Sequence, residues 1–432
     1  MKAVLRNVLV ATTSMIAVGG MVSGAQAGGF INSSQSTVLN GMAYAGAAAG
    51  GSSSAATMFY NPATMTSFTG LVIDSNYTFG LPSSKATGAF SGALSAGLNA
   101  ALPGAAKYDK DYFVPATYIV YQISDKLWGG ISINSTYGNQ TKADTLWRGS
   151  LAAASTKLRV ITATPSIAYK INEQWSIGAG LQIQYASARQ MVAFPFAPLP
   201  VPGAGIEKAD GWAVGFTLGA TYVPVQGTQI GLGIRSLTEQ NVEGTTRYGG
   251  VQNASSKGTL NLPNRVNLSL RQTINPQLDV LASVEWQNWS RIGHAKLNNP
   301  ANAALAVLPF GYDDGWFFSL GAEYKATDKL KLRAGVGYEI SPVNSQVRRL
   351  SLPDSDRIWA SIGGSYQVTE RMTLNASYSY LHFQKANITQ VIVPGALTFN
   401  GVSKQNAHLL SVGLTSKWGD APKKEEPLVK KF

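Results

Sequence analysis

The chain of 432 residues contains no cysteine, few charged residues and, beyond its first 22 residues, no long apolar run. Without cysteine there is no disulfide and no thiolate chemistry, although an exported protein could have used disulfides. Without an apolar run of ~20 residues there is no membrane-spanning helix in the remainder of the chain. Hydrophobic residues nevertheless make up 45% of the sequence, so they must be dispersed among polar ones.

The N-terminus has the organisation of a secretory signal. Lys2 and Arg6 precede an apolar run from about Val8 to Val22, and Ala25-Gln26-Ala27 supplies the small residues that a signal peptidase reads. A membrane anchor is the alternative, but Thr, Ser and Gly residues dilute the run and it is short for a span. We predict a signal peptide over residues 1–27, cleaved before Gly28.

Residues 330–340 separate into two faces. Six apolar residues alternate with Lys331, Arg333, Gly335, Gly337 and Glu339. Because successive side chains of a strand point to opposite faces, this segment has one apolar and one polar face. Such a strand separates a lipid phase from water.

The same alternation recurs in segments near 175–185, 212–222, 278–286 and 316–325. Aromatic residues stand at one or both ends of each apolar face, as in the girdles at a membrane–water boundary. A soluble β-sandwich would also alternate, but it would not need aromatic residues at these positions.

The connections alternate between short turns and long stretches. Short turns are predicted near 124–126, 172–174, 275–277, 326–329 and 369–371, and long irregular loops near 81–111, 140–156, 191–210, 241–256, 290–313, 342–355 and 386–404. This layout is typical of an outer-membrane barrel, whose strand number is even. We therefore predict an all-β, membrane-spanning antiparallel β-barrel of about fourteen strands over residues 68–418, in the bacterial outer membrane.

A barrel of this size would leave an open lumen unless another segment filled it. Residues 28–67 are rich in Gly, Ala and Ser, lack strand periodicity and carry no charge, so we predict that they form an N-terminal hatch inside the barrel. Residues 419–432 form a charged C-terminal tail. Either Trp418 ends the barrel and the tail is periplasmic, or Phe432 serves as the terminal aromatic residue that guides assembly.

The formal net charge of +12 is spread over strands, loops and the tail, whereas a nucleic-acid site would concentrate it in a patch. We expect no nucleic-acid partner, and anionic lipid, including lipopolysaccharide, as the surroundings of a monomer. His294, His382 and His408 do not form a metal-ligand spacing, and no Gly-x-Ser-x-Gly elbow or phosphate loop occurs. We therefore expect no metal, no cofactor and no enzyme; a phospholipase is the catalytic alternative.

Several short motifs resemble the FadL family of outer-membrane long-chain fatty acid transporters and their relatives that import aromatic hydrocarbons. Gly29-Phe30 follows the cleavage site and Asn61-Pro62-Ala63 precedes the first strand. Further matches are Trp286 with Trp289-Ser290, Ser341-Pro342-Val343 and the run from Leu352 to Trp359. Together they span nearly the whole mature chain.

The resemblance implies passive uptake of hydrophobic molecules, most readily long-chain fatty acids. A ligand would be caught in an apolar groove of extracellular loops, pass to a pocket in the lumen, and be released by hatch movement through a lateral gap beside a kinked strand. By the same resemblance, Phe30 would touch the inner pocket, and Asn61, Pro62 and Ala63 would anchor the hatch. Asn61-Pro62 could equally be a simple turn signal.

The loop from Met191 to Asp210 is unusually apolar for an exposed segment, and apolar patches mark interaction sites. We predict that it captures the ligand, through Phe194, Phe196, Leu199 and Val201. The alternatives are packing of the loop against other loops or contact with lipid.

Lumen-facing cations could hold a carboxylate head group by charge-assisted hydrogen bonds. The candidates are Lys331, Arg333 and Arg357. The alternative is that they pair with lumen acids such as Glu323 and Glu339. Aromatic hydrocarbon uptake, a general diffusion porin and a structural wall protein are the competing functions.

Overall fold

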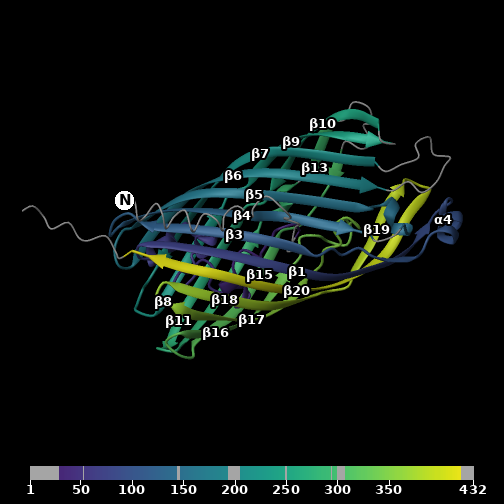
Figure 1. Ribbon diagram of the computed structural model, residues 1–432. Helices are drawn as coiled ribbons and strands as arrows, with labels where there is room; N and C mark the ends of the chain where they lie inside the picture. The colour runs from purple at the N-terminus through teal and green to yellow at the C-terminus, as the bar shows by residue number, and fades with distance from the viewer. Residues whose placement is uncertain are drawn as a thin grey trace, which may run out of the picture.

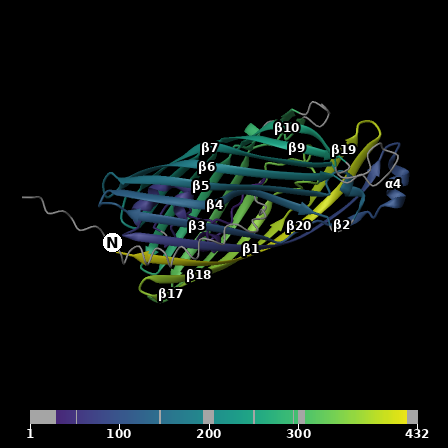
Figure 2. The ribbon, with the colours of Figure 1, turned by 45° about the horizontal axis from the view of Figure 1, so that its top comes forward.

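The strands of the computed structural model close into one antiparallel barrel of fourteen strands (Figures 1 and 2). The structure describes residues 29–51, 53–143, 146–192, 205–248, 251–292, 294–298 and 307–419. The first strand closes the ring by pairing with the last on one side and with the second on the other. The predicted signal peptide, the tail beyond Gly419 and the four predicted capture residues lie outside the described residues.

Nine of the fourteen strands are continuous single segments, and five include a second segment or a short companion strand. In chain order the strands are β1 (Leu71–Ser91), β3 (Tyr112–Gln122) with the short β2 (Ala105–Lys107) before it, β4 (Leu127–Lys142), β5 (Ser155–Lys170), β6 (Trp175–Val192), β7 (Gly205–Tyr222), β8 (Thr228–Arg235) continued by β9 (Thr238–Tyr248), β10 (Val251–Leu262) continued by β11 (Arg265–Asn275), β12 (Leu278–Gln287) continued by β13 (His294–Asn298), β15 (Gly315–Lys325), β16 (Leu330–Ile340), β17 (Arg357–Thr369), β18 (Met372–Phe383) continued by β19 (Ala386–Val393), and β20 (Leu397–Trp418).

The predicted two-faced pattern is confirmed in β16. Leu332 and Val336 on the outer face are 46% and 57% exposed, whereas Glu339 on the inner face is 2% exposed. The outer face meets lipid, and the inner face meets the contents of the lumen. Aromatic pairs mark the two ends of the outer face, with Trp175 stacked on Tyr222 at the short-turn end.

Several of the predicted irregular loops are instead strand extensions. β1 runs to Ser91 and stays paired with β20 as far as Thr398, and β9 and β10 form a hairpin. Alternation fades in these extensions because both faces of a strand are wet once it leaves the membrane. The loops add the short elements α4 (Ser95–Ala101), η3 (Arg148–Leu151), η4 (Trp289–Ile292) and β14 (Val307–Pro309).

Residues 29–67, at the purple end of the colour scale, lie inside the ring of strands (Figure 1). Their short elements are α2 (Thr37–Asn40), α3 (Thr57–Tyr60) and η2 (Pro62–Ser67), and nearly all their side chains are buried. In the described part of the chain, no helix is both long and apolar enough to cross a membrane. We call residues 29–67 the hatch.

The wall is irregular where β4 passes the start of the hatch. The β3–β4 ladder runs from Gln122↔Trp128 to Ala116↔Asn134, and beyond it a bulge interrupts the β4–β5 register between Ser135 and Tyr137. A bulge bends its strand and leaves one residue unpaired. The extra residue is Thr136, and beyond the end of the β3–β4 ladder the hatch takes the place of β3, because Ile31 bridges to Tyr137.

Candidate functional site

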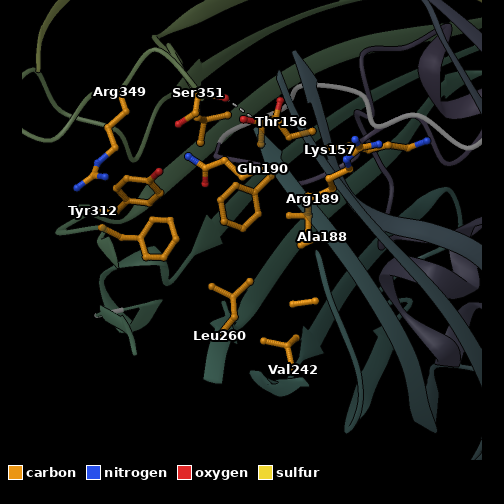
Figure 3. A pocket seen from close by; sticks show the side chains of 16 residues that line it. Thr156, Lys157, Ala188, Arg189, Gln190, Val242, Leu260, Tyr312, Arg349 and Ser351 are labelled. Atoms are coloured by element: carbon orange, nitrogen blue, oxygen red, sulfur yellow. Dashed lines mark hydrogen bonds between the residues drawn. The ribbon is translucent and has the colours of Figure 1, made fainter. Parts of the chain in front are cut away.

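A cavity of about 180 Å³ lies between the hatch and the wall, toward the end of the barrel that carries the long loops. The hatch contributes Phe30, and the strands and loops contribute the remaining lining (Figure 3). Most of the lining is apolar, which is typical of a pocket for a small hydrophobic ligand. The principal apolar residues are Leu158, Ala188, Ala209, Val242, Leu260, Phe310 and Leu352.

Strand register brings the apolar side chains of the wall together. Leu158 of β5 lies directly opposite Ala188 of β6, and Ala188 lies opposite Ala209 of β7. Because these three residues are paired across neighbouring strands, their side chains lie on the same face of the sheet, which is the lumen face. Two alanines in this row fill little volume, so space remains between the wall and Phe30.

Aromatic rings form the other side of the cavity. The ring of Phe30 meets that of Trp289 edge-on at 4.8 Å between centroids, and the Phe310 ring lies 6.3 Å away. Tyr312 contacts both Trp289 and Phe310. Burial raises the pKa of the Tyr312 phenol, which therefore stays protonated and can donate a hydrogen bond.

The N-terminal end of the hatch is held in place by the bulged part of β4. The backbone amide of Gly138 donates to the Phe30 carbonyl at 2.8 Å, and that of Asn32 donates to the Thr136 carbonyl at 3.0 Å. Phe30 is thus fixed between two strand-like hydrogen bonds. The position of Phe30 in the cavity therefore depends on the position of β4 at its bulge.

A second contact fixes the same segment to a loop. The Gly29 amide donates to Asp354 Oδ2 at 2.9 Å, and Ser341 Oγ donates to the same oxygen at 2.6 Å. The other oxygen of Asp354 accepts from Arg357 Nη2 at 2.7 Å. The segments 341–343 and 352–359, which carry two of the sequence motifs, therefore meet at the start of the hatch.

Polar groups lie at one end of the cavity. Figure 3 shows Arg349 beside Tyr312, with Gln190 and Thr156 on the wall strands nearby. Asn139 Nδ2 donates to the Ser351 carbonyl at 3.0 Å and so ties β4 to the loop that carries Arg349. An elongated ligand with one polar end could place its apolar part against Phe30 and its polar end here.

Asn61, Pro62 and Ala63 lie where the hatch meets β6 and β7. Asn61 Nδ2 donates to the Ala48 carbonyl of the hatch and to the Ala220 carbonyl of β7, both at 2.8 Å. Its Oδ1 accepts from the Ala63 amide at 3.0 Å and begins η2, with Pro62 at the first position. Asn61 thus links two segments of the hatch to each other and links the hatch to the barrel wall.

The three predicted carboxylate partners are engaged by acids. Glu323 accepts from Arg333 at 2.7 Å and from Lys331 at 3.1 Å, and it also pairs with Arg271 at 2.8 Å. Arg357 lies 3.2 Å from Glu339. None of the three cations belongs to the lining of the cavity described above.

Sequence reasoning missed most of the cavity residues. Arg349 and Tyr312 were not singled out, and Trp289 was noted only as part of a motif. No local pattern marks these residues, because the cavity joins side chains from the hatch, six strands and two loops. The available signal was the pair of motifs at 286–290 and 352–359. In the structure, residues of both motifs contact the N-terminal end of the hatch.

A closed antiparallel barrel with an internal hatch and an apolar cavity between hatch and wall defines an outer-membrane transport protein of the plugged type. Residues 20–418 match the model of a family described as outer membrane protein transport protein (OMPP1/FadL/TodX). The chain belongs to this family, as the sequence motifs indicated. It is an outer-membrane transport protein and not an enzyme.

Individual relatives agree with this assignment. The chain is 27% identical to the long-chain fatty acid transport protein of Escherichia coli O6:H1 over 331 residues, covering 68% of this chain and 74% of that protein. It is 27% identical to outer membrane protein P1 of Haemophilus influenzae over 460 residues, covering 94% and 97%.

Solved structures share the fold. A Pseudomonas aeruginosa FadL homologue matches with a TM-score of 0.81 at 22% identity, covering 90% of this chain and all of that one. The Pseudomonas putida toluene transporter TodX matches with a TM-score of 0.64 at 16% identity, covering 89% and 98%. The relatives thus include proteins named for fatty acids and for an aromatic hydrocarbon.

Proposed function

We propose that this protein admits hydrophobic small molecules passively through the outer membrane, with long-chain fatty acids as its main substrate. The observation that carries the proposal is the apolar cavity at Phe30, with Arg349 and Tyr312 at one end. An acyl chain of ~10 methylenes gains ~0.8 kcal/mol for each one that it buries, so apolar contact alone supplies ample affinity. Arg349 supplies the charge that a carboxylate needs.

The route has three steps. The apolar loop that contains Phe194, Phe196, Leu199 and Val201 captures the molecule at the cell surface. The cavity beside Phe30 then receives it. Because the Phe30 segment is hydrogen-bonded to the β4 bulge, movement of the hatch opens the cavity toward the wall beyond Ala116↔Asn134, where β3 and β4 are not paired, and the ligand leaves sideways there.

Monoaromatic hydrocarbons are the second candidate, and cavity size favours them. A cavity of ~150 Å³ lined by apolar residues is enough to bind benzene in an engineered protein. The cavity here, at about 180 Å³, would hold one ring, whereas a long acyl chain would extend beyond it. A head-group cation is needed only by the fatty acid.

The two candidates can be separated by uptake assays in an outer-membrane transport mutant that expresses the chain. Phe30→Ala should reduce uptake of both labelled oleate and toluene at limiting concentration, by about ten-fold, because a ring contact of ~1.5 kcal/mol or more is lost. Arg349→Gln should reduce oleate uptake and leave toluene uptake unchanged. Arg371→Gln, in the turn before β18, is the charge-matched control and should affect neither.

If Phe30→Ala takes up each compound as fast as wild type does, the cavity is not the binding site. Toluene uptake without oleate uptake in the wild-type chain would replace the fatty acid by the aromatic substrate. Phe194→Ser/Phe196→Ser tests the capture loop separately, and undiminished uptake at limiting ligand would remove that loop from the route.

A further inference from the structure

Three cations form a row on the outer surface of the barrel. Lys157 of β5 lies directly opposite Arg189 of β6, and Arg189 lies directly opposite Lys208 of β7. All three side chains are exposed. They have the opposite parity from the neighbouring cavity row at Leu158, so their side chains point away from the lumen, although Lys157 and Arg189 also belong to the residues that line the cavity. Figure 3 shows the side chains of Lys157 and Arg189 running together to the side away from Tyr312.

Such a row is unfavourable for the protein alone. Directly opposite side chains on one face of an antiparallel pair have their Cβ atoms ~4.5–5.5 Å apart, and like charges placed there repel. Two further cations extend the patch. Arg159, which is half-buried, is two residues from Lys157 on the same face. Lys142 of β4, which is exposed, lies opposite Ser155, two residues from Lys157 toward the rim. An anion between these groups would turn repulsion into attraction.

The described residues do not supply that anion. Within the described ranges, no ion pair joins any of the five cations to an acid, although ten pairs occur elsewhere. The nearby Asp210 interacts with Tyr185, and Glu243 pairs with Lys257 at 2.6 Å. The patch therefore keeps a net positive charge on the outer wall.

The position of the row relative to the aromatic girdle identifies the layer of the membrane that surrounds it. Four residues nearer the membrane centre on β6, the outer surface carries Tyr185 against Trp212, with ring centroids 5.1 Å apart and Trp212 65% exposed. This pair belongs to the aromatic girdle at the long-loop end of the barrel. At ~3.4 Å per residue, the cation row lies ~14 Å along the tilted strand beyond the girdle residue Tyr185, in the layer of lipid head groups.

We propose that Lys157, Arg189 and Lys208 form a binding site for the phosphate groups of lipopolysaccharide in the outer leaflet. Neighbouring strands are ~4.8 Å apart, so the row presents three cations over ~10 Å along the barrel wall. Arg189 at the centre can bind one phosphate with two parallel hydrogen bonds, while the flanking lysines act as point charges. Lys142 and Arg159 complete the field around it.

Binding of lipid A to the purified full-length protein in detergent tests this site. The probes are lipid A with both phosphates and the same lipid after removal of its phosphates. Lys157→Gln/Arg189→Gln/Lys208→Gln should weaken binding of the phosphorylated lipid by about ten-fold or more, because charge-assisted hydrogen bonds are lost. The control Lys126→Gln/Lys170→Gln/Lys329→Gln removes equal charge from the short-turn end and should bind as wild type does.

Lys157→Arg/Lys208→Arg keeps the charges and should retain binding, which guards against a folding defect in the glutamine variant. Equal binding of both lipids to the wild-type protein, or equal losses in the row variant and the control, would overturn the proposal. The measurement uses no transported ligand, so its outcome is independent of the substrate proposed above.

Discussion

Asp354 links the first hatch residues to the loop that precedes β17. It accepts hydrogen bonds from the Gly29 amide, from Ser341 and from Arg357, and it is 3% exposed. Asp354→Asn should therefore release the segment that carries Phe30, at a cost of about 1.5–3 kcal/mol for the weakened hydrogen bonds to a charged group. Hydrogen exchange at the Asn32 amide, which bonds to β4, should become faster.

Asp313→Asn is a suitable control for that experiment. Asp313 accepts from Asn344 in an exposed contact and does not touch the hatch. If both variants exchange at the wild-type rate, Asp354 does not hold the N-terminal end of the hatch.

Asp314 gives the site a pH dependence at the start of β15. Burial alone would raise its pKa, but hydrogen bonds from Ser290, Asn288 and Trp286 lower the pKa below its ordinary value. A carboxylate with a lowered pKa stabilises the folded state above its unfolded pKa of ~3.9, and this stability is lost as pH falls through the folded pKa. These contacts hold η4 and thus Trp289 against Phe30.

Asp314→Asn should lower the thermal unfolding temperature at neutral pH. The difference from wild type should shrink on acidification, because the wild-type carboxylate is then protonated as well. A difference that stays constant from neutral to strongly acid pH would show that the charge of Asp314 contributes nothing.

At the scale of elements, the hatch lies against glycines of β6, β7 and β8. A Cβ atom at Gly219 would lie 1.8 Å from Asn61 Oδ1, and one at Gly231 would lie 1.8 Å from the Ala48 carbonyl. The glycine positions on lumen faces, which in the sequence only indicated a polar face, thus serve to admit the hatch backbone. Sequence alone could not show this, because the hatch lacks periodicity.

Gly219→Ala should displace the hatch from the wall. The added methyl group needs Asn61 to move, and overpacking of this kind costs typically about 1–3 kcal/mol. The expected result is a folded barrel with a lower unfolding temperature and faster proteolysis of the hatch. Gly97→Ala, where an added Cβ meets nothing within 4 Å, is the control. Equal behaviour of the two variants would contradict a tight contact at Gly219.

The elements themselves were largely predictable, and the site was not. Alternation located the strands such as β16 because lipid and lumen impose opposite demands on successive residues. It could not locate breaks such as that between β8 and β9, which depends on long-range hydrogen bonds of Ser236 with Phe216 and of Leu237 with Asn264. The lumen cations were predicted to face inward, but the pairing of Lys331 and Arg333 with Glu323 needs the register of β15 against β16.

At the scale of the whole molecule, the hatch decides between a ligand channel and a diffusion porin. An unfilled barrel of fourteen strands would conduct ions, since its wall side chains cannot fill the lumen. Planar-bilayer recordings of the intact protein should show no large steady current, and deletion of residues 35–60 should produce one. Large steady currents from the intact protein would identify a diffusion porin instead.

The hatch is packed most tightly against the glycines of β6, β7 and β8 in the half of the barrel near the short turns, whereas the cavity at Phe30 and the bulge of β4 lie in the other half. The two halves can therefore differ in permeability. On the route proposed above, loosening the half near the long loops would let a hydrophobic molecule pass, while the packed half near the short turns would still exclude ions and water-soluble toxins. A cell could thus take up hydrophobic compounds and keep the permeability barrier of its outer membrane.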